Sequence, residues 1–187
     1  MMELKKHCFI INLFKQGDLV MKPYEMTEEF HRTFDPRRPK EPTAFTKEDV
    51  LHRAGFKVEE LVEFVYSISE NNPQLFETAV DSLHQSLDQA KAKVLAKGNS
   101  VTDPLVEQVD ALIDLLYFTY GSFSLLGVDP EPIIEIVHQA NMGKLFPDGK
   151  PHYDPETGKV LKPDNWEQDF APEGKSKEEL DRQKNQR

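Results

Sequence analysis

Hydrophobic residues recur at helical spacing through most of the chain between residues 24 and 142. Between residues 58 and 68, for example, apolar side chains fall three or four positions apart and form one stripe: Val58, Leu61, Val62, Val65 and Ile68. No alternating strand pattern competes anywhere in residues 45–142. The pattern predicts helices at about residues 24–34, 46–71, 74–96, 104–126 and 131–142.

Start and stop signals agree with these boundaries. Thr46 is followed three residues later by Asp49, which is typical of a helix start. Pro73 can open the third helix, which the Lys97-Gly98-Asn99 sequence ends, and Asp103-Pro104 opens the fourth. Long amphipathic helices with short connections favour antiparallel neighbours. The sequence therefore predicts an all-α fold, an antiparallel helical bundle of four to five helices.

The flanking segments differ from this pattern. Residues 1–22 form an N-terminal appendage, in which the short apolar run 8–14 is a strand or a helix docked on the bundle. Residues 23–170 are expected to be one domain, with an irregular arm from Gly143 to Phe170 that turn-forming residues interrupt. Residues 171–187 are charged and are predicted to be a disordered tail.

Composition narrows the classes of partner. The chain has 187 residues and a net charge of -10, which disfavours binding to nucleic acid or to an anionic membrane surface. Cys8 is the single cysteine, so an internal disulfide is excluded and a reducing compartment fits. The apolar run that follows it is too short to span a bilayer. We therefore expect a cytoplasmic protein without membrane or nucleic-acid partners.

Two groups of acidic residues lie on the predicted helices. Spacings of three and four residues place Glu60 with Glu63, and Asp110 with Asp114, on single helical faces. Asp110 and Asp114 share a largely apolar stripe, where a carboxylate is costly unless a cation or a hydrogen-bond donor meets it. Four carboxylates converging from two helices would suit Mg²⁺ or Mn²⁺.

A simpler interpretation applies to the first group. An EExxE sequence on a helix is often a solvated face with charge pairs between residues i and i+4. The second group is harder to explain in this way, because Asp114 is flanked by Ile113, Leu115 and Leu116. Together the two groups favour a metal site, provided that their helices pack face to face.

Five motifs resemble those of a known family. They are EELVE at residues 59–63, DLLYFTYG at 114–121, LGVD at 126–129, HQANMGK at 138–144 and TGKVLKPDNW at 157–166. In their order and spacing the chain resembles the all-α nucleoside triphosphate pyrophosphohydrolases. These form the MazG-like and phosphoribosyl-ATP pyrophosphohydrolase-like group, and the resemblance is strongest to its dUTPase-like branch. It covers about residues 24–169.

The resemblance implies an activity and assigns roles to residues. It implies metal-dependent hydrolysis of a nucleoside triphosphate between the α and β phosphates, with dUTP or another non-standard or deoxy nucleotide as candidate substrates in nucleotide-pool house-cleaning. Glu59 would act as the catalytic base on water. The metal ligands would be Glu60, Glu63, Asp110 and Asp114, and the substrate-binding residues Asn141, Lys144, Lys159 and Lys162.

The second acidic helix departs from the family pattern. The family carries Glu-x-x-Asp there, and the YFTYG register makes Asp114 the aspartate, so Ala111 occupies the glutamate position. Asp110 is the obvious replacement, because it keeps the face of Asp114. Glu107 and Asp110 give a second possible register, in which Glu107 is a ligand; in the preferred one Glu107 supports the ligands from outside.

Two alternative functions and one partner remain to be weighed. The family forms homodimers or homotetramers, so the resemblance implies a second copy of the chain as partner. A non-catalytic helical interaction module would explain the acidic faces as merely solvated. A phosphoribosyl-ATP pyrophosphohydrolase is the alternative within enzymes, although the extra LKPDNW segment argues against it. Base preference depends on pocket shape and is not readable from the sequence.

Overall fold

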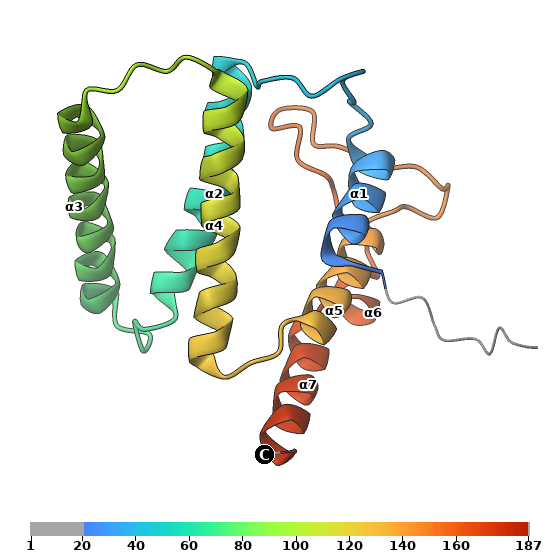
Figure 1. Ribbon diagram of the computed structural model, residues 1–187. Coiled ribbons are helices and arrows are strands. Elements are labelled where there is room, and N and C mark those ends of the chain that lie inside the picture. Colours follow the sequence, from blue (N-terminus) through green and yellow to red (C-terminus); the bar gives the residue numbers. More distant parts are fainter. Residues whose placement is uncertain (1–20, 187) are drawn as a thin grey trace, which may run out of the picture. The chain divides into compact units, whose positions relative to one another are not determined.

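The computed structural model describes residues 21–186, and within them it is all-helical (Figure 1). Cys8 and most of the predicted appendage lie outside the described residues. The helices are α1 (Pro23–Phe34), α2 (Lys47–Tyr66), α3 (Pro73–Lys97), α4 (Pro104–Leu126), α5 (Glu131–Met142), α6 (Trp166–Asp169) and α7 (Glu173–Asn185). Among the described residues the only β pairing is an isolated antiparallel bridge between Tyr153 and Val160. The all-α prediction is confirmed.

The predicted start signals act as local caps. Thr46 Oγ1 accepts a hydrogen bond from the Asp49 N–H at 3.1 Å, and so satisfies one of the donors that open α2. The Asn72 side chain caps α3 in the same way, accepting from Gln74 N–H at 3.0 Å. Asp103 Oδ1 accepts from Leu105 N–H at 3.0 Å at the start of α4. Side-chain oxygens thus fix where these three helices begin.

Helix α2 ends five residues before the predicted limit of residue 71. Glu70 and Asn71 have φ angles of 51° and 62°, in the left-handed region. A right-handed helix cannot continue through such residues, so the chain turns there and restarts at Pro73. Hydrophobic periodicity up to Ile68 did not reveal this turn.

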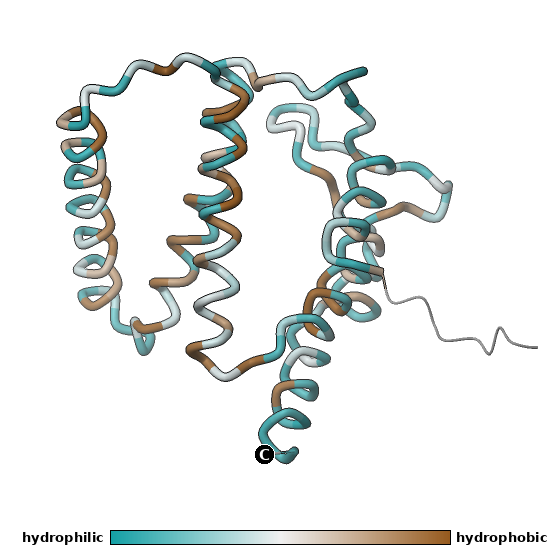
Figure 2. Tube along the Cα trace, viewed as in Figure 1, coloured by the Kyte–Doolittle hydropathy of each residue, from teal (hydrophilic) through white to brown (hydrophobic). Residues whose placement is uncertain are grey.

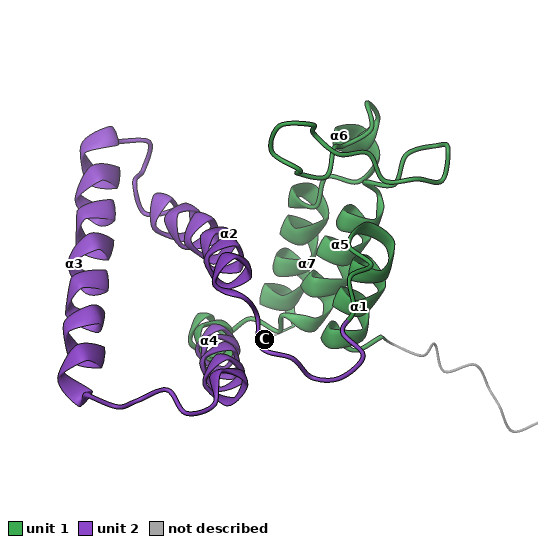
Figure 3. Cartoon of the chain, turned by 90° about the horizontal axis from the view of Figure 1, so that it is seen from above, with its two compact units in different colours: residues 1–38, 120–187 green, residues 39–119 purple. Residues whose placement is uncertain are grey.

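The chain forms two compact units, coloured separately in Figure 3. Unit 1 comprises residues 1–38 and 120–187, and unit 2 comprises residues 39–119, so the boundary falls inside α4. In unit 1, α5 packs against both α1 and α7. Its buried apolar residues are Met26, Phe34, Ala140 and Trp166. The prediction that residues 23–170 act as one domain stays a prediction.

Unit 2 has little core of its own. Ser69 is its only buried residue, although α2 packs against α3. Brown segments on α2 and α4 in Figure 2 mark apolar stretches. Large apolar side chains that are exposed include Leu51, Val58, Leu61 and Phe64 on α2, and Val109, Ile113, Leu116 and Phe118 on α4. These helices have the composition of core elements without the burial of core elements.

Helix α4 is long and apolar enough to cross a membrane, by length and composition alone. The core helix of a soluble protein passes the same test. Three carboxylates on this helix, those of Glu107, Asp110 and Asp114, would each be costly inside a bilayer. They favour a protein environment for α4.

The C-terminal segment corrects one prediction. Residues 173–185 form α7 rather than a disordered tail, and α7 packs on α5. Gln183 makes two hydrogen bonds to the backbone of Asp129: its Oε1 accepts from N–H at 2.9 Å and its Nε2 donates to the carbonyl at 2.9 Å. The side chain therefore joins α7 to the turn that precedes α5.

We expect Gln183→Ala to lower the stability of the protein. The change removes both hydrogen bonds to Asp129, and each such bond contributes about 0.5–1.5 kcal/mol. Chemical denaturation followed by circular dichroism measures the loss. Lys177→Gln on the same helix is the control, since its pair with Asp181 is exposed to solvent and contributes little to stability. Equal stabilities for the two variants would show that Gln183 does not hold α7 in place.

Candidate functional site

The first acidic group lies on α2. Glu59, Glu60 and Glu63 are all exposed, on the helix that Thr46 caps. Their exposure leaves the carboxylate oxygens accessible to a cation.

The second acidic group lies on α4, with Glu107, Asp110 and Asp114 exposed. Gln108, between the first two, makes a pair of hydrogen bonds with Phe45, the residue before the cap of α2. Phe45 N–H donates to Gln108 Oε1 at 2.8 Å, and Gln108 Nε2 donates to the Phe45 carbonyl at 3.3 Å. This contact joins the residue before the cap of α2 to the first turns of α4, within unit 2.

The carboxylates of the two helices do not form a metal-binding group in one chain. Within residues 21–186, no three His, Cys, Asp or Glu side chains lie close enough together to hold a metal ion. Carboxylate oxygens are nevertheless the ligands that Mg²⁺ and Mn²⁺ prefer, so the donor chemistry fits a hard divalent cation. The assignment of Glu60, Glu63, Asp110 and Asp114 as metal ligands stays a prediction.

The predicted substrate-binding residues Asn141, Lys144 and Lys162 gather in unit 1. Lys144 Nζ donates to Asn141 Oδ1 at 2.8 Å, at the end of α5. Burial lowers the pKa of Lys144, and the nearby ammonium group of Lys162 lowers this pKa further. Lys162 Nζ lies 3.6 Å from the centroid of the Trp166 ring and 3.4 Å from Glu167 Oε1. The two lysines are therefore within electrostatic reach of each other.

Lys159 lies in the turn of the hairpin that leads to this cluster. Its carbonyl accepts a hydrogen bond from Asp154 N–H at 2.8 Å, and its side chain is exposed. The Asp154 carboxylate accepts from the Thr157 N–H at 2.7 Å and from the Thr157 hydroxyl at 2.8 Å, which hold the pKa of Asp154 below its usual value. The turn is thus ordered by its own polar groups.

The hairpin and α6 are fastened to the rest of unit 1 at three points. The Tyr153 hydroxyl donates to the Phe34 carbonyl at the end of α1, at 2.8 Å. The Trp166 indole N–H donates to the Ala140 carbonyl at 2.7 Å. Phe170 packs directly on Gly143, where a β-carbon would collide with its ring. The irregular arm from Gly143 to Phe170 is therefore held by specific contacts.

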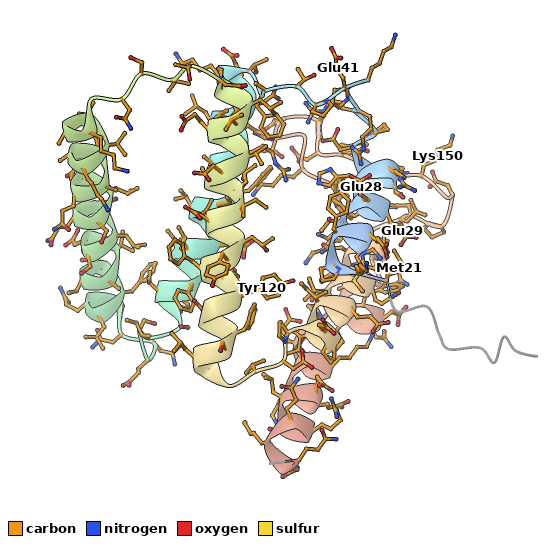
Figure 4. All side chains as sticks on the ribbon, viewed as in Figure 1. Met21, Glu28, Glu29, Glu41, Tyr120 and Lys150 are labelled. Atoms are coloured by element: carbon orange, nitrogen blue, oxygen red, sulfur yellow. The ribbon has the colours of Figure 1, made fainter. Side chains whose placement is uncertain are left out.

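Sequence reasoning missed a contact between the buried His138 of α5 and the exposed Glu29 of α1. His138, 7% exposed, lies with Nε2 3.0 Å from Glu29 Oε2. Figure 4 labels Glu29 and its neighbour Glu28 on α1. The helical position of Glu29 among other acidic residues gave no signal, because its partner is 109 residues away.

A hollow of about 130 Å³ lies at the turn after α4, lined by Leu126, Gly127, Val128, Leu180, Gln183 and Lys184. None of the predicted site residues lines it. Its walls are mostly apolar. It lies where α7 meets the turn after α4, and neither polar cluster contributes to its walls.

Comparison with known proteins identifies the family. The family model for phosphoribosyl-ATP pyrophosphohydrolase matches residues 27–141. The chain belongs to this family. A crystal structure named as a candidate NTP pyrophosphohydrolase from Exiguobacterium sp. 255-15 is 40% identical, with a TM-score of 0.79, and the match covers 89% of this chain and 98% of that one. No curated protein matches the chain.

Membership of the phosphoribosyl-ATP pyrophosphohydrolase family settles the reaction class. The protein is a hydrolase that acts on phosphoric anhydrides, and pyrophosphohydrolase activity on nucleotides follows in general terms. The alternative of a non-catalytic interaction module loses its support. The MazG-like and phosphoribosyl-ATP pyrophosphohydrolase-like group that the motifs resemble is the correct superfamily.

We expect Gly143→Ala to destabilise the C-terminal part of this family member. The new methyl group would displace the Phe170 ring, and overpacking of this kind costs about 1–3 kcal/mol. Thermal unfolding measures the effect. Gly174→Ala on α7 is the matched control, because nothing lies within 4 Å of the added atom. A melting temperature that is lowered equally in both variants, or in neither, would contradict the packing of Phe170 on Gly143.

Proposed function

We propose that the protein hydrolyses a nucleoside triphosphate between the α and β phosphates, giving the monophosphate and pyrophosphate. The observation that carries the proposal is that both acidic groups, residues 59–63 and 107–114, fall inside the segment 27–141 that matches the family. Removal of unwanted nucleotides from the cytoplasmic pool is the role that this reaction would serve.

The carboxylates have different roles in this reaction. Glu60, Glu63, Asp110 and Asp114 would hold Mg²⁺, or Mn²⁺ in its place, with Glu107 supporting them from outside. A divalent ion bound there supplies neutralisation of phosphate charge and acidification of a water molecule. Glu59 accepts the proton that the attacking water loses. The P–O bond between the α and β phosphates then breaks, and pyrophosphate leaves with the bridging oxygen or gains the water oxygen, according to which phosphorus is attacked.

Unit 1 carries the proposed nucleotide-binding residues. Lys144, Lys159 and Lys162 contact phosphate oxygens, since ammonium groups bind phosphates as point charges. Asn141 can donate and accept hydrogen bonds toward the base or the sugar. Support comes from the short distances that already join Asn141 to Lys144 and Lys162 to Trp166.

A homodimer or homotetramer is the working form. Apolar side chains of α2 and α4 are exposed in the single chain, and α4 has the composition of a core helix. Exposed apolar surface on this scale is typical of protein interfaces rather than of monomers. A second copy of the chain would cover these helices and bring further carboxylates toward them.

Two substrates compete within this proposal. The dUTPase-like motifs favour dUTP or another non-standard or deoxy nucleotide, and the 40% identical relative is named for NTPs. The family model is named for phosphoribosyl-ATP, which favours that compound as a second candidate substrate. Both share a triphosphate, so the same carboxylates and lysines would serve either.

We expect pyrophosphate release that depends on a divalent metal. Purified protein is incubated with each common NTP and dNTP, dUTP and phosphoribosyl-ATP, with Mg²⁺ or Mn²⁺, and pyrophosphate is measured. Excess EDTA should abolish the release, because the phosphates and the carboxylates then repel each other without neutralisation. A folded, oligomeric protein that releases pyrophosphate from none of these compounds would overturn the proposal, as would activity that survives EDTA.

We expect Asp110→Asn to reduce activity about as severely as Asp114→Asn. If Asp110 replaces the glutamate missing at Ala111, both changes remove a metal ligand. Glu107→Gln should be milder, since loss of a group outside the ligand set typically costs roughly 10-fold to 100-fold. The measurements are kcat/KM and the metal concentration that gives half-maximal rate. A larger loss for Glu107→Gln than for Asp110→Asn would favour the other register.

A further inference from the structure

One side chain, that of Trp166, contacts both Lys162 and the end of α5, which Lys144 follows. Trp166 is 6% exposed, and its indole N–H donates to the Ala140 carbonyl at 2.7 Å. Asn141 directly follows Ala140, and Lys144 comes three residues after Asn141. The indole therefore contacts the helical turn that carries two of the proposed substrate-binding residues.

The Ala140 carbonyl needs this donor. In a continuing helix it would accept from the N–H of Lys144, four residues on. Lys144 N–H instead donates to the Asn141 carbonyl at 3.1 Å, because the helix tightens and ends here. The indole supplies a hydrogen bond to a buried carbonyl, which would otherwise be costly to leave unpaired.

The ring of the same indole lies against Lys162. Lys162 Nζ is 3.6 Å from the ring centroid, within the range of a cation–π interaction. Lys162 comes from the arm, 18 residues beyond Lys144, and yet its charge lowers the pKa of Lys144. Bringing two ammonium groups together is unfavourable by itself, and it becomes favourable when a multiply charged anion binds between them.

We propose that Trp166 is a positioning residue, which holds Lys162 beside Lys144 so that the two ammonium groups together bind the polyphosphate of the substrate and the pyrophosphate product. The inference rests on the proposed function, in which these lysines contact phosphate. Trp166 itself is buried and acts through its neighbours. Its N–H fixes the turn of Lys144, and its ring fixes Lys162.

A binding experiment uses the fact that Trp166 is the only tryptophan in the chain. Inorganic pyrophosphate is titrated into the full-length protein while tryptophan emission is recorded. An anion that recruits Lys162 changes the charge over the ring, so a saturable change in emission is expected. Lys162→Met should abolish the change or weaken binding about tenfold or more, and Lys177→Met, on the exposed face of α7, should leave it unaltered. Pyrophosphate binding that is equal in wild type and Lys162→Met would overturn the proposal.

Kinetics of Trp166 variants separate positioning from simple packing. Trp166→Phe keeps a ring for Lys162 but loses the donor to Ala140, and Trp166→Leu loses both. We expect KM for the triphosphate to rise about threefold to tenfold in Trp166→Phe, and more in Trp166→Leu, with kcat nearly unchanged, as for lost uniform binding. A purely structural role would lower the melting temperature and leave the KM of the folded fraction unchanged, which contradicts the inference.

A double-mutant cycle gives the decisive comparison. In a Lys162→Met background, Trp166→Leu should raise KM less than it does in the wild type, because the part of its effect that acts through Lys162 is already lost. Pyrophosphate affinity from calorimetry should follow the same pattern, so the cycle can be read without turnover. Additive effects would overturn the inference. If Trp166→Leu does not fold, the KM of Trp166→Phe decides instead, and an unchanged KM in that variant would overturn the inference.

Failure of the proposed function would give different results from failure of the positioning inference. If Lys144→Met and Lys162→Met leave both KM and pyrophosphate affinity unchanged, the lysines do not bind phosphate and the proposed function of this cluster is wrong. If both lysine variants weaken binding while the Trp166 variants do not, only the positioning inference fails. Lysine-dependent pyrophosphate binding without hydrolysis of any triphosphate would overturn the activity and leave the positioning role in place.

Discussion

The apolar faces of α2 and α4 require cover that one chain does not give them. Unit 2 has a single buried residue, Ser69, while large apolar side chains on both helices are exposed. Burial contributes about 25 cal/mol per Å² of apolar surface, so helices that leave such faces in water lack the main source of stability. The acidic groups lie on these same two helices. Whatever covers the apolar faces thus also decides how close the carboxylates come to one another.

Unit 1, in contrast, buries apolar side chains among its own helices. Helix α5 lies against α1 and α7, and the buried side chains Met26, Phe34, Ala140 and Trp166 supply its core. Polar contacts then fix the details: His138 pairs with Glu29, Tyr153 bonds the end of α1, and Gln183 bonds the turn before α5. The positions of Lys144 and Lys162 depend on this core, because Lys144 follows α5 and Lys162 lies on the indole ring of Trp166.

Helices α1 to α5 could be predicted because each has a periodic apolar stripe within one segment, and α2, α3 and α4 also begin at a local side-chain cap. Helix α7 could not be predicted in this way. Its composition is charged, and disorder was expected. Its order comes from pairs within the helix, such as Arg182 with Glu179, which holds the pKa of Glu179 at about 2, and from Gln183 reaching Asp129, which is 54 residues away. The amino-acid composition of a segment does not show how its charged side chains pair or whether a distant backbone group bonds to it.

The candidate site shows the same division between local and distant information. Spacing on one helix decides which carboxylates share a face, so Glu60 with Glu63 and Asp110 with Asp114 could be named from the sequence as a hypothesis. Convergence of the two faces depends on packing between helices, which spacing does not encode. The lysines illustrate the opposite case. Lys144 and Lys162 could be named from motifs. The contacts that link their segments could not, because the hydrogen bond from Trp166 to Ala140 joins residues 26 apart and forms where α5 tightens and ends, and the Trp166 ring that lies against Lys162 gave no sign of this partner in the sequence.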